Sequence, residues 1–153
     1  MYAMISAGSN MEDSRAHLAS VAEEFDAELL EASSIYVTKP WGGVEQPDFY
    51  NQSFLIDPPL DTPYSLLARC QRLEQEANRT RDVRWGPRTL DVDIIDIEGY
   101  EIDDIELTVP HPRAHLREFV LVPWLEIDPG ACLRGRPVRE WLAKLEPQGV
   151  RKL

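Results

Sequence analysis

The sequence lacks the features of a membrane-embedded or exported protein. No apolar run approaches the roughly 20 residues that a transmembrane helix needs. Residues 1–6 do not show the basic and then apolar pattern of a signal peptide. There are only two cysteines, Cys70 and Cys132, which form no metal-ligand spacing, and Cys70 falls in a helical pattern that predicts a buried thiol. These absences favour a cytoplasmic protein with reduced cysteines.

Several catalytic motifs are also missing. The chain contains no GxxxxGK(S/T) loop, no GxSxG, no HExxH and no CxxC. This argues against P-loop enzymes, serine hydrolases, zinc proteases and thiol redox enzymes. No internal repeat, linker or low-complexity segment divides the chain, and its 153 residues are enough to bury a core. One domain over 1–153 is therefore expected.

Positive charge is scarce overall but concentrated locally. The net charge of −11 predicts a surface that repels nucleic acid, so neither a nucleic-acid nor a membrane partner is expected. Yet Arg79, Arg81, Arg84 and Arg88 lie within ten residues, opposed there only by Asp82. Because the planar guanidinium matches phosphate oxygens in pairs, this segment indicates a small polyanionic ligand. A solvated charge run at a helix end is the alternative.

The hydrophobic periodicity predicts alternating strands and helices. Strands are expected at 2–8, 30–38, 49–57 and 89–97, with another near 101–107. Helices are expected at 13–27, 63–78 and 137–145, and residues 110–124 mix proline with helix-like stretches. Thr62 and Pro63 suit the N-cap and first position of the second helix. The order predicts an α/β (α+β) ferredoxin-like βαββαβ sandwich with an antiparallel sheet, extra hairpin strands and helices on both faces.

Two aspartates inside an apolar strand are the sharpest chemical signal. Asp91 and Asp93 leave the same face of the strand because side chains alternate, while Val92 leaves the other. Adjacent like charges repel, so a positive partner is expected, and Mg²⁺ prefers a few carboxylates with phosphate oxygens and water. The alternative is a pair of exposed acids on a solvent-facing sheet.

Aromatic residues and one histidine are further candidates. Trp41 and Trp85 lie in segments rich in glycine, proline or arginine, where they serve either as half-buried anchors or as lids over a flat ligand. Phe49 and Phe119 are core residues by default. His111 lies between two prolines and is a phosphate ligand, a local hydrogen-bond partner or an exposed residue.

Residues 84–94, RWGPRTLDVDI, resemble the signature of the 6-hydroxymethyl-7,8-dihydropterin pyrophosphokinase family. Other segments follow in the family's order: GSN at 8–10, TKPWG at 38–42, QPDFYN at 46–51, QRLE at 71–74, TVPHP at 108–112 and REF at 117–119. The resemblance spans residues 2–129. It implies the βαββαβ fold and an ATP-dependent diphosphokinase of folate biosynthesis that transfers pyrophosphate from Mg-ATP to the hydroxymethyl group of the pterin, releasing AMP.

The resemblance also implies roles for individual residues. The catalytic set would be Arg79, Arg88, Asp91 and Asp93, and the two aspartates would hold two Mg²⁺ ions. ATP would be contacted by Gln71, Glu74, Arg84, Ile94, Thr108, His111 and Arg117. The pterin would be contacted by Gly8, Thr38, Trp41, Phe49, Asn51, Trp85 and Phe119. Besides these two substrates no partner is expected, and the protein is expected to be a monomer.

Three departures from the family pattern and two rival functions stand beside this hypothesis. The segment with the arginines is one residue shorter than in some relatives, which bears on Arg79, Arg81 and Asp82. Lys39 stands where proline is common, and Trp41 where an aliphatic residue is common. One rival is a metal-dependent phosphohydrolase with the same aspartates and arginines, which would need a positioned water. Segments 39–48 and 78–88 instead have the glycines and arginines of closing loops that exclude water. The other rival is a non-catalytic ferredoxin-like module, which offers no reason to place aspartates beside arginines.

Overall fold

The computed structural model describes residues 1–10, 13–39, 48–79 and 90–153, without the side chain of Arg79. Within this part, the main sheet has six strands in the order β10-β3-β4-β1-β5, with β2 also paired to β4. The strands are β1 Ala3–Ser9, β2 Leu29–Ala32, β3 Tyr36–Thr38, β4 Phe49–Ile56, β5 Asp91–Ile97 and β10 Arg151–Lys152. Every pairing in this sheet is antiparallel.

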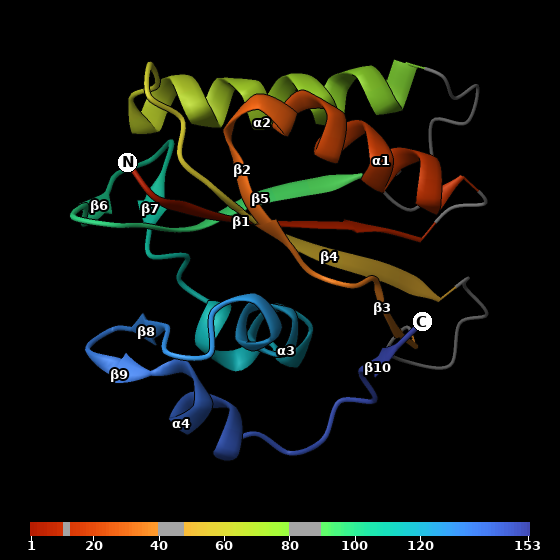
Figure 1. Ribbon diagram of the computed structural model, residues 1–153, viewed down its shortest axis with the longest axis vertical. Helices are drawn as coiled ribbons and strands as arrows, with labels where there is room; N and C mark the ends of the chain where they lie inside the picture. The colour runs from red at the N-terminus through yellow and green to blue at the C-terminus, as the bar shows by residue number, and fades with distance from the viewer. Residues whose placement is uncertain (11–12, 40–47, 80–89) are drawn as a thin grey trace.

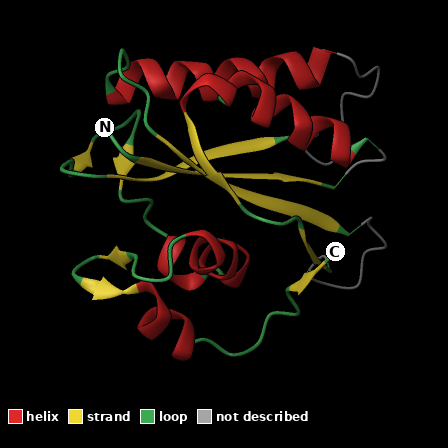
Figure 2. Cartoon of the chain, viewed as in Figure 1, coloured by secondary structure: helices red, strands yellow, loops and turns green. Residues whose placement is uncertain are grey.

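Helices cover both faces of the sheet (Figure 1). On one face lie α1 Ser14–Glu24, the 3₁₀ helix η1 Asp26–Glu28 and α2 Pro63–Arg79. On the other lie α3 Glu118–Ile127 and α4 Val138–Ala143, with the 3₁₀ helix η2 Ala114–Leu116 before α3. Two small hairpins, β6 Ile102–Asp103 with β7 Thr108–Val109 and β8 Cys132–Leu133 with β9 Arg136–Pro137, complete the elements (Figure 2). The predicted ferredoxin-like sandwich with added hairpins is confirmed.

The predicted strand at 30–38 is wrong as one continuous element, because β2 and β3 are separate. Between them, the backbone N–H and the hydroxyl of Ser34 both donate to the carboxylate of Glu126 on α3, at 2.9–3.1 Å. The Ser34 N–H, which could have continued the hydrogen bonding of a strand, is therefore bound by a side chain of α3. Sequence periodicity cannot anticipate this, since Glu126 is 92 residues away.

Other element boundaries shift by a few residues. The helix predicted at 13–27 ends at Glu24 and continues as η1, and the strand predicted near 101–107 is reduced to β6. Asp104 accounts for the second change, because its Oδ1 accepts the backbone N–H groups of Glu106 and Leu107 and turns the chain. Such local carboxylate bonds compete with strand formation.

The start of α2 agrees with the sequence. Thr62 Oγ1 accepts the N–H of Ser65 at 3.1 Å, and Ser65 Oγ accepts the N–H of Thr62 at 2.9 Å. This reciprocal pair satisfies donors that the helix itself cannot satisfy, and such caps stabilise a helix by typically about 1 kcal/mol. α2 packs beside β5, the strand that carries Asp91 and Asp93.

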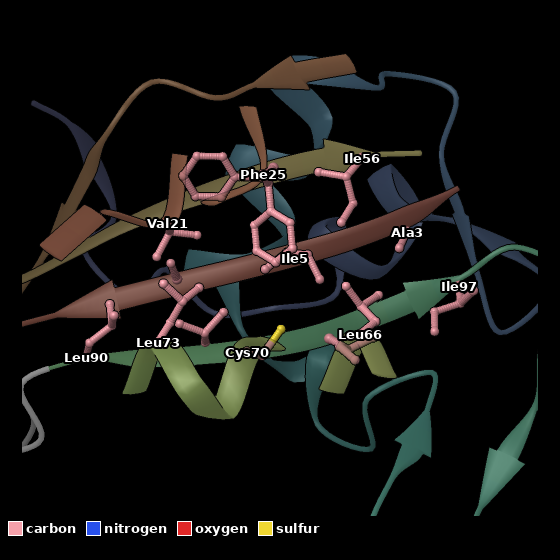
Figure 3. Packing of buried hydrophobic residues seen from close by; sticks show 14 of the residues in the cluster. Ala3, Ile5, Val21, Phe25, Ile56, Leu66, Cys70, Leu73, Leu90 and Ile97 are labelled. Atoms are coloured by element: carbon pink, nitrogen blue, oxygen red, sulfur yellow. The ribbon is translucent and has the colours of Figure 1, made fainter. Parts of the chain in front are cut away.

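The main core lies between the sheet and the α1–α2 layer (Figure 3). Alternate sheet residues such as Ile5 pack there against Phe25 of the α1 layer and Cys70 and Leu73 of α2. A second core lies under α3 and α4 and includes Met4, Ile95, Val120, Leu121 and Trp124. Among the described residues, no helix is both long and apolar enough to cross a membrane.

Candidate active site

A cavity of about 230 Å³ opens on the α3 side of the sheet. On this face the side chains change from apolar to polar along two neighbouring strands. Met4 of β1 is followed by Ser6 and Gly8, and Ile95 of β5 is preceded by Asp93 and Asp91 in the same alternation. The cavity is lined by Ser6, Gly8, Thr38, Lys39, Phe49, Asn51, Asp91, Asp93, Arg117, Phe119 and Gln148.

The register of the central strands aligns the polar residues in rows. Gly8 of β1 lies opposite Asn51 of β4 on one side and opposite Asp91 of β5 on the other. Ser6 lies opposite Asp93. The floor therefore runs from an amide to a carboxylate across three strands, so a ligand lying on it can meet hydrogen-bonding groups at one end and negative charge at the other.

Gly8 is required because Asn51 approaches it closely. A Cβ atom placed on Gly8 would lie 2.7 Å from Asn51 Oδ1, which is closer than Cβ atoms approach other atoms in real structures. The Asn51 amide is fixed from its other side, because Nδ2 donates to Thr38 Oγ1 at 3.1 Å in a buried hydrogen bond. Its orientation is thus set before any ligand arrives.

Two aromatic rings and an arginine form other walls of the cavity. Phe49 begins β4 and Phe119 lies in the first turn of α3, and both side chains are half-buried. The Arg117 guanidinium carbon lies 5.5 Å from the centroid of the Phe119 ring, within cation–π range. Aromatic faces suit a flat heterocycle, and the arginine adds a positive charge close to them.

Asp91 and Asp93 both line the cavity and are half-buried, so the prediction that they share one face is confirmed. Glu74 of α2 lies next to this strand, and its Oε2 accepts the Val92 N–H at 3.0 Å. Among the described residues, no group of three or more His, Cys, Asp and Glu side chains could hold a metal alone. Two carboxylates open to a cavity do fit Mg²⁺, which takes its remaining ligands from phosphate oxygens and water.

His111 is half-buried beside this site. Its Nδ1 accepts the backbone N–H of Arg113 at 3.1 Å. Burial lowers the pKa of His111 below its ordinary value, and nearby Arg117 and Arg113 lower it further, against the raising effect of Asp93. The imidazole is therefore neutral at pH 7 and can act there as a hydrogen-bonding group.

The cavity brings together eight of the residues proposed from sequence: Gly8, Thr38, Phe49, Asn51, Asp91, Asp93, Arg117 and Phe119. Of the others in the described part of the chain, His111 lies beside the cavity and four lie elsewhere. Gln71 is exposed on α2, Glu74 binds the backbone of β5, Ile94 is buried in the α1–α2 core, and Thr108 is half-buried on β7. The predictions for Trp41, Arg84, Trp85 and Arg88, and for the side chain of Arg79, lie outside the described residues.

Sequence reasoning assigned no role to three residues that line the cavity. Ser6 precedes Gly8 by two positions, so strand alternation could have identified it. Lys39 adjoins Thr38 and was noted only as a departure from the family pattern. Gln148 has no local signal, because it reaches the cavity through hydrogen bonds to residues about thirty positions earlier.

Comparison with known proteins gives consistent matches. The model of the 7,8-dihydro-6-hydroxymethylpterin-pyrophosphokinase (HPPK) family matches residues 4–129. The 2-amino-4-hydroxy-6-hydroxymethyldihydropteridine pyrophosphokinase of Mycobacterium tuberculosis is 45% identical, over 94% of this chain and 84% of its own length. The enzyme of the same name from Methylorubrum extorquens is 40% identical, over 99% of this chain and 98% of its own.

Solved structures show the same fold. The chain of a crystal structure described as HPPK-DHPS in complex with substrates superposes with a TM-score of 0.75 at 11% identity, covering 99% of this chain and 46% of that one. Plasmodium falciparum HPPK-DHPS A437G, solved with STZ-DHP, gives a TM-score of 0.68 at 12% identity, covering 94% and 45%. This chain thus spans less than half the length of those two.

Proposed function

We propose that this chain, which belongs to the 7,8-dihydro-6-hydroxymethylpterin-pyrophosphokinase family, transfers pyrophosphate from Mg-ATP to the hydroxymethyl group of 6-hydroxymethyl-7,8-dihydropterin. AMP is released, and the product serves folate biosynthesis. One observation carries the proposal: paired carboxylates, two aromatic rings, a fixed amide and an arginine all line one cavity. A phosphate-transfer enzyme with a flat acceptor needs this combination.

The pterin is proposed to occupy the aromatic end of the cavity. Phe49 and Phe119 offer ring faces for stacking against a planar heterocycle. Asn51 then hydrogen-bonds the polar edge of the pterin, in the orientation that its bond to Thr38 sets. The missing side chain of Gly8 leaves room for this contact.

Mg-ATP is proposed to occupy the carboxylate end. Asp91 and Asp93 would hold two Mg²⁺ ions, which when bound would offset the negative charge of the triphosphate. Arg117 would contact phosphate oxygens, and His111 would form a hydrogen bond to them. Arg79 and Arg88 are proposed, from the family resemblance, to meet charge that develops during transfer.

The reaction leaves little covalent chemistry to the protein. The hydroxymethyl oxygen of the pterin releases its proton and attacks the β-phosphorus. The bond from that phosphorus to the oxygen bridging to the α-phosphate breaks, and AMP departs with that oxygen. The side chains serve to align the two substrates, keep water away from the phosphorus and stabilise charge. The cavity draws its lining from Ser6 to Gln148, which supports the proposal that residues 1–153 act as one domain, and a monomer remains a proposal.

A product assay tests the proposal against the phosphohydrolase alternative. The protein is incubated with Mg-ATP, with and without 6-hydroxymethyl-7,8-dihydropterin, and nucleotides are separated. We expect AMP to form only when the pterin is present, in equal amount to the pyrophosphorylated pterin. Release of phosphate from ATP without pterin would instead support a hydrolase, for which Phe49 and Phe119 would have no use.

A further inference from the structure

Arg117 occupies an unusual position at the start of α3. It is the N-cap residue, with extended backbone angles of φ −116° and ψ 107°, and its own side chain makes no capping hydrogen bond within the described structure. Most N-cap residues carry an oxygen that accepts a free backbone N–H of the first turn. A guanidinium has only donors and cannot do this. The first turn of α3 therefore needs an acceptor from elsewhere.

Gln148 supplies that acceptor from a distant part of the chain. Its Oε1 accepts the Glu118 N–H at 3.0 Å, and its Nε2 donates to the Leu116 carbonyl oxygen at 3.0 Å. The two bonds lie on either side of Arg117, as the bonds from a neighbouring antiparallel strand would. One side-chain amide thus fixes both peptide groups that flank Arg117, and with them the direction in which its side chain leaves the backbone.

The position of Gln148 is itself well determined. Its backbone N–H donates to Glu118 Oε2 at 2.6 Å. A few residues later, β10 pairs with β3, and the Leu153 N–H donates to the Ile35 carbonyl oxygen at 2.9 Å. Figure 1 shows this segment running from α4 to β10 at the edge of the sheet. Gln148 is therefore held against the start of α3, in a segment that β10 attaches to β3, and it also lines the cavity.

We propose that Gln148 is a positioning residue that orients Arg117 toward the phosphates of bound ATP. The inference rests on the phosphate contact proposed above for Arg117. Gln148 lies beyond residue 129, where the family match ends, so the match assigns it no role. Arg117 can then face the ligand because Gln148, not the Arg117 side chain, accepts a free backbone N–H of the first turn, that of Glu118.

A Gln148→Met variant tests the proposal. Methionine keeps the length and approximate volume of the side chain and removes both amide hydrogen bonds. Because small misplacements of a binding group have large effects on transfer, we expect kcat/KM for Mg-ATP to fall about tenfold, mainly through KM. The KM for the pterin should change less, and circular dichroism should show a folded protein.

A Gln52→Met variant is the matched control. Gln52 Nε2 also donates to a backbone carbonyl, that of Ser33 at 2.8 Å, and its half-buried side chain is not among the described residues that line the cavity. We expect wild-type kinetics for this variant, with a melting temperature lowered about as much as in Gln148→Met. An equal loss of kcat/KM in both variants would mean that Gln148 acts only through stability.

A double-mutant cycle separates the inference from the function on which it rests. If Gln148 acts through Arg117, adding Gln148→Met to Arg117→Ala lowers kcat/KM no further. If the double variant loses kcat/KM by the full factor seen for Gln148→Met alone, the inference is overturned. It is also overturned if Gln148→Met has wild-type kinetics while Arg117→Ala is impaired. If Arg117→Ala itself has wild-type kinetics, the phosphate contact proposed for Arg117 is wrong, and the inference about Gln148 is overturned with it. Should the methionine variant not fold, Gln148→Asn, which shortens the amide's reach by one methylene, takes its place with the same outcomes.

Discussion

At the residue scale, the floor of the cavity depends on the absence of a side chain at Gly8. The close approach of Asn51 Oδ1 leaves no space for a methyl group, and the bond to Thr38 prevents the amide from simply turning away. Any side chain at position 8 must therefore displace Asn51 or separate β1 from β4. The first is the smaller change, and it would alter the edge that the pterin is proposed to meet.

Gly8→Ala is accordingly expected to weaken pterin binding selectively. We expect the KM for the pterin to rise on the order of tenfold, while Mg-ATP binding is little changed, because Asn51 moves and Asp91 does not. Steady-state kinetics with each substrate varied in turn measure this. Gly130→Ala is the control, since an added Cβ there meets no described atom within 4 Å. Equal effects on the two substrates would contradict the assignment of Asn51.

Asp93→Asn tests the carboxylate end of the cavity. Removing one of two adjacent negative charges relieves repulsion, so we expect folding to be preserved, while turnover falls on the order of a hundredfold or more because the metal-holding charge is lost. Calorimetry with Mg-ATP should show weakened, less magnesium-dependent binding. Asp96→Asn on the same strand is the control, because Asp96 borders a different hollow with Glu98 and Asp128. Full turnover in a folded Asp93→Asn protein would remove the metal role.

At the element scale, a carboxylate of α3 adds hydrogen bonds from the edge of the sheet to the apolar packing beneath the helix. Glu126 accepts the hydroxyl of Tyr36 at 2.6 Å in addition to its bonds from Ser34. Burial, together with this bond, raises the pKa of Tyr36 to about 12. Burial acts to raise the pKa of Glu126 too, but the bonds from Tyr36 and Ser34 outweigh it and the pKa is lowered. Since α3 carries Phe119 and follows Arg117, this attachment helps to set one wall of the cavity.

Glu126→Gln is expected to destabilise the protein at neutral pH and not at acid pH. The folded carboxyl has a pKa below its unfolded value of about 4.5, so its contribution is present above that pH and is lost as the pH falls through the folded pKa. Because the side chain is largely exposed, the contribution is on the order of 1 kcal/mol after solvent screening. Urea unfolding at both pH values measures it. A stability difference that persists in acid would show that the charge of Glu126 is not its source.

The elements show which parts of the site a sequence can predict. Asp91 and Asp93 were predictable because strand alternation is local, and the start of α2 because Thr62 and Ser65 are three residues apart. The division between β2 and β3 was not, since it depends on Glu126. Gln148 was missed for the same reason. Hydrogen bonds between polar groups of different layers cannot be predicted from local sequence. In this protein such bonds shape the wall of the cavity.

At the scale of the whole molecule, the cavity and the main core lie on opposite faces of one sheet. Asp93 and Ser6 face the cavity, while their neighbours Ile94 and Ile5 face the α1–α2 core. A ligand that binds in the cavity on one face of the sheet therefore also stabilises the main core on the other face, because both depend on the same folded sheet. By mass action, a ligand at one hundred times its Kd adds about 2.7 kcal/mol to the free energy of unfolding.

The two cysteines allow this coupling to be measured. Cys132 is exposed, whereas Cys70 is buried in the α1–α2 core, where desolvation, with smaller effects of Glu74 and Asp93, raises the pKa of its thiol to about 12. Only a thiolate reacts with a thiol reagent, so Cys132 should be labelled at once and Cys70 only when the core opens. Saturating Mg-ATP should slow the labelling of Cys70 about a hundredfold, following the added stability, and leave Cys132 unchanged. If the two thiols reacted equally fast, Cys70 would be accessible in the native protein. If Mg-ATP slowed neither, binding at the carboxylate end would not be linked to the stability of the core across the sheet.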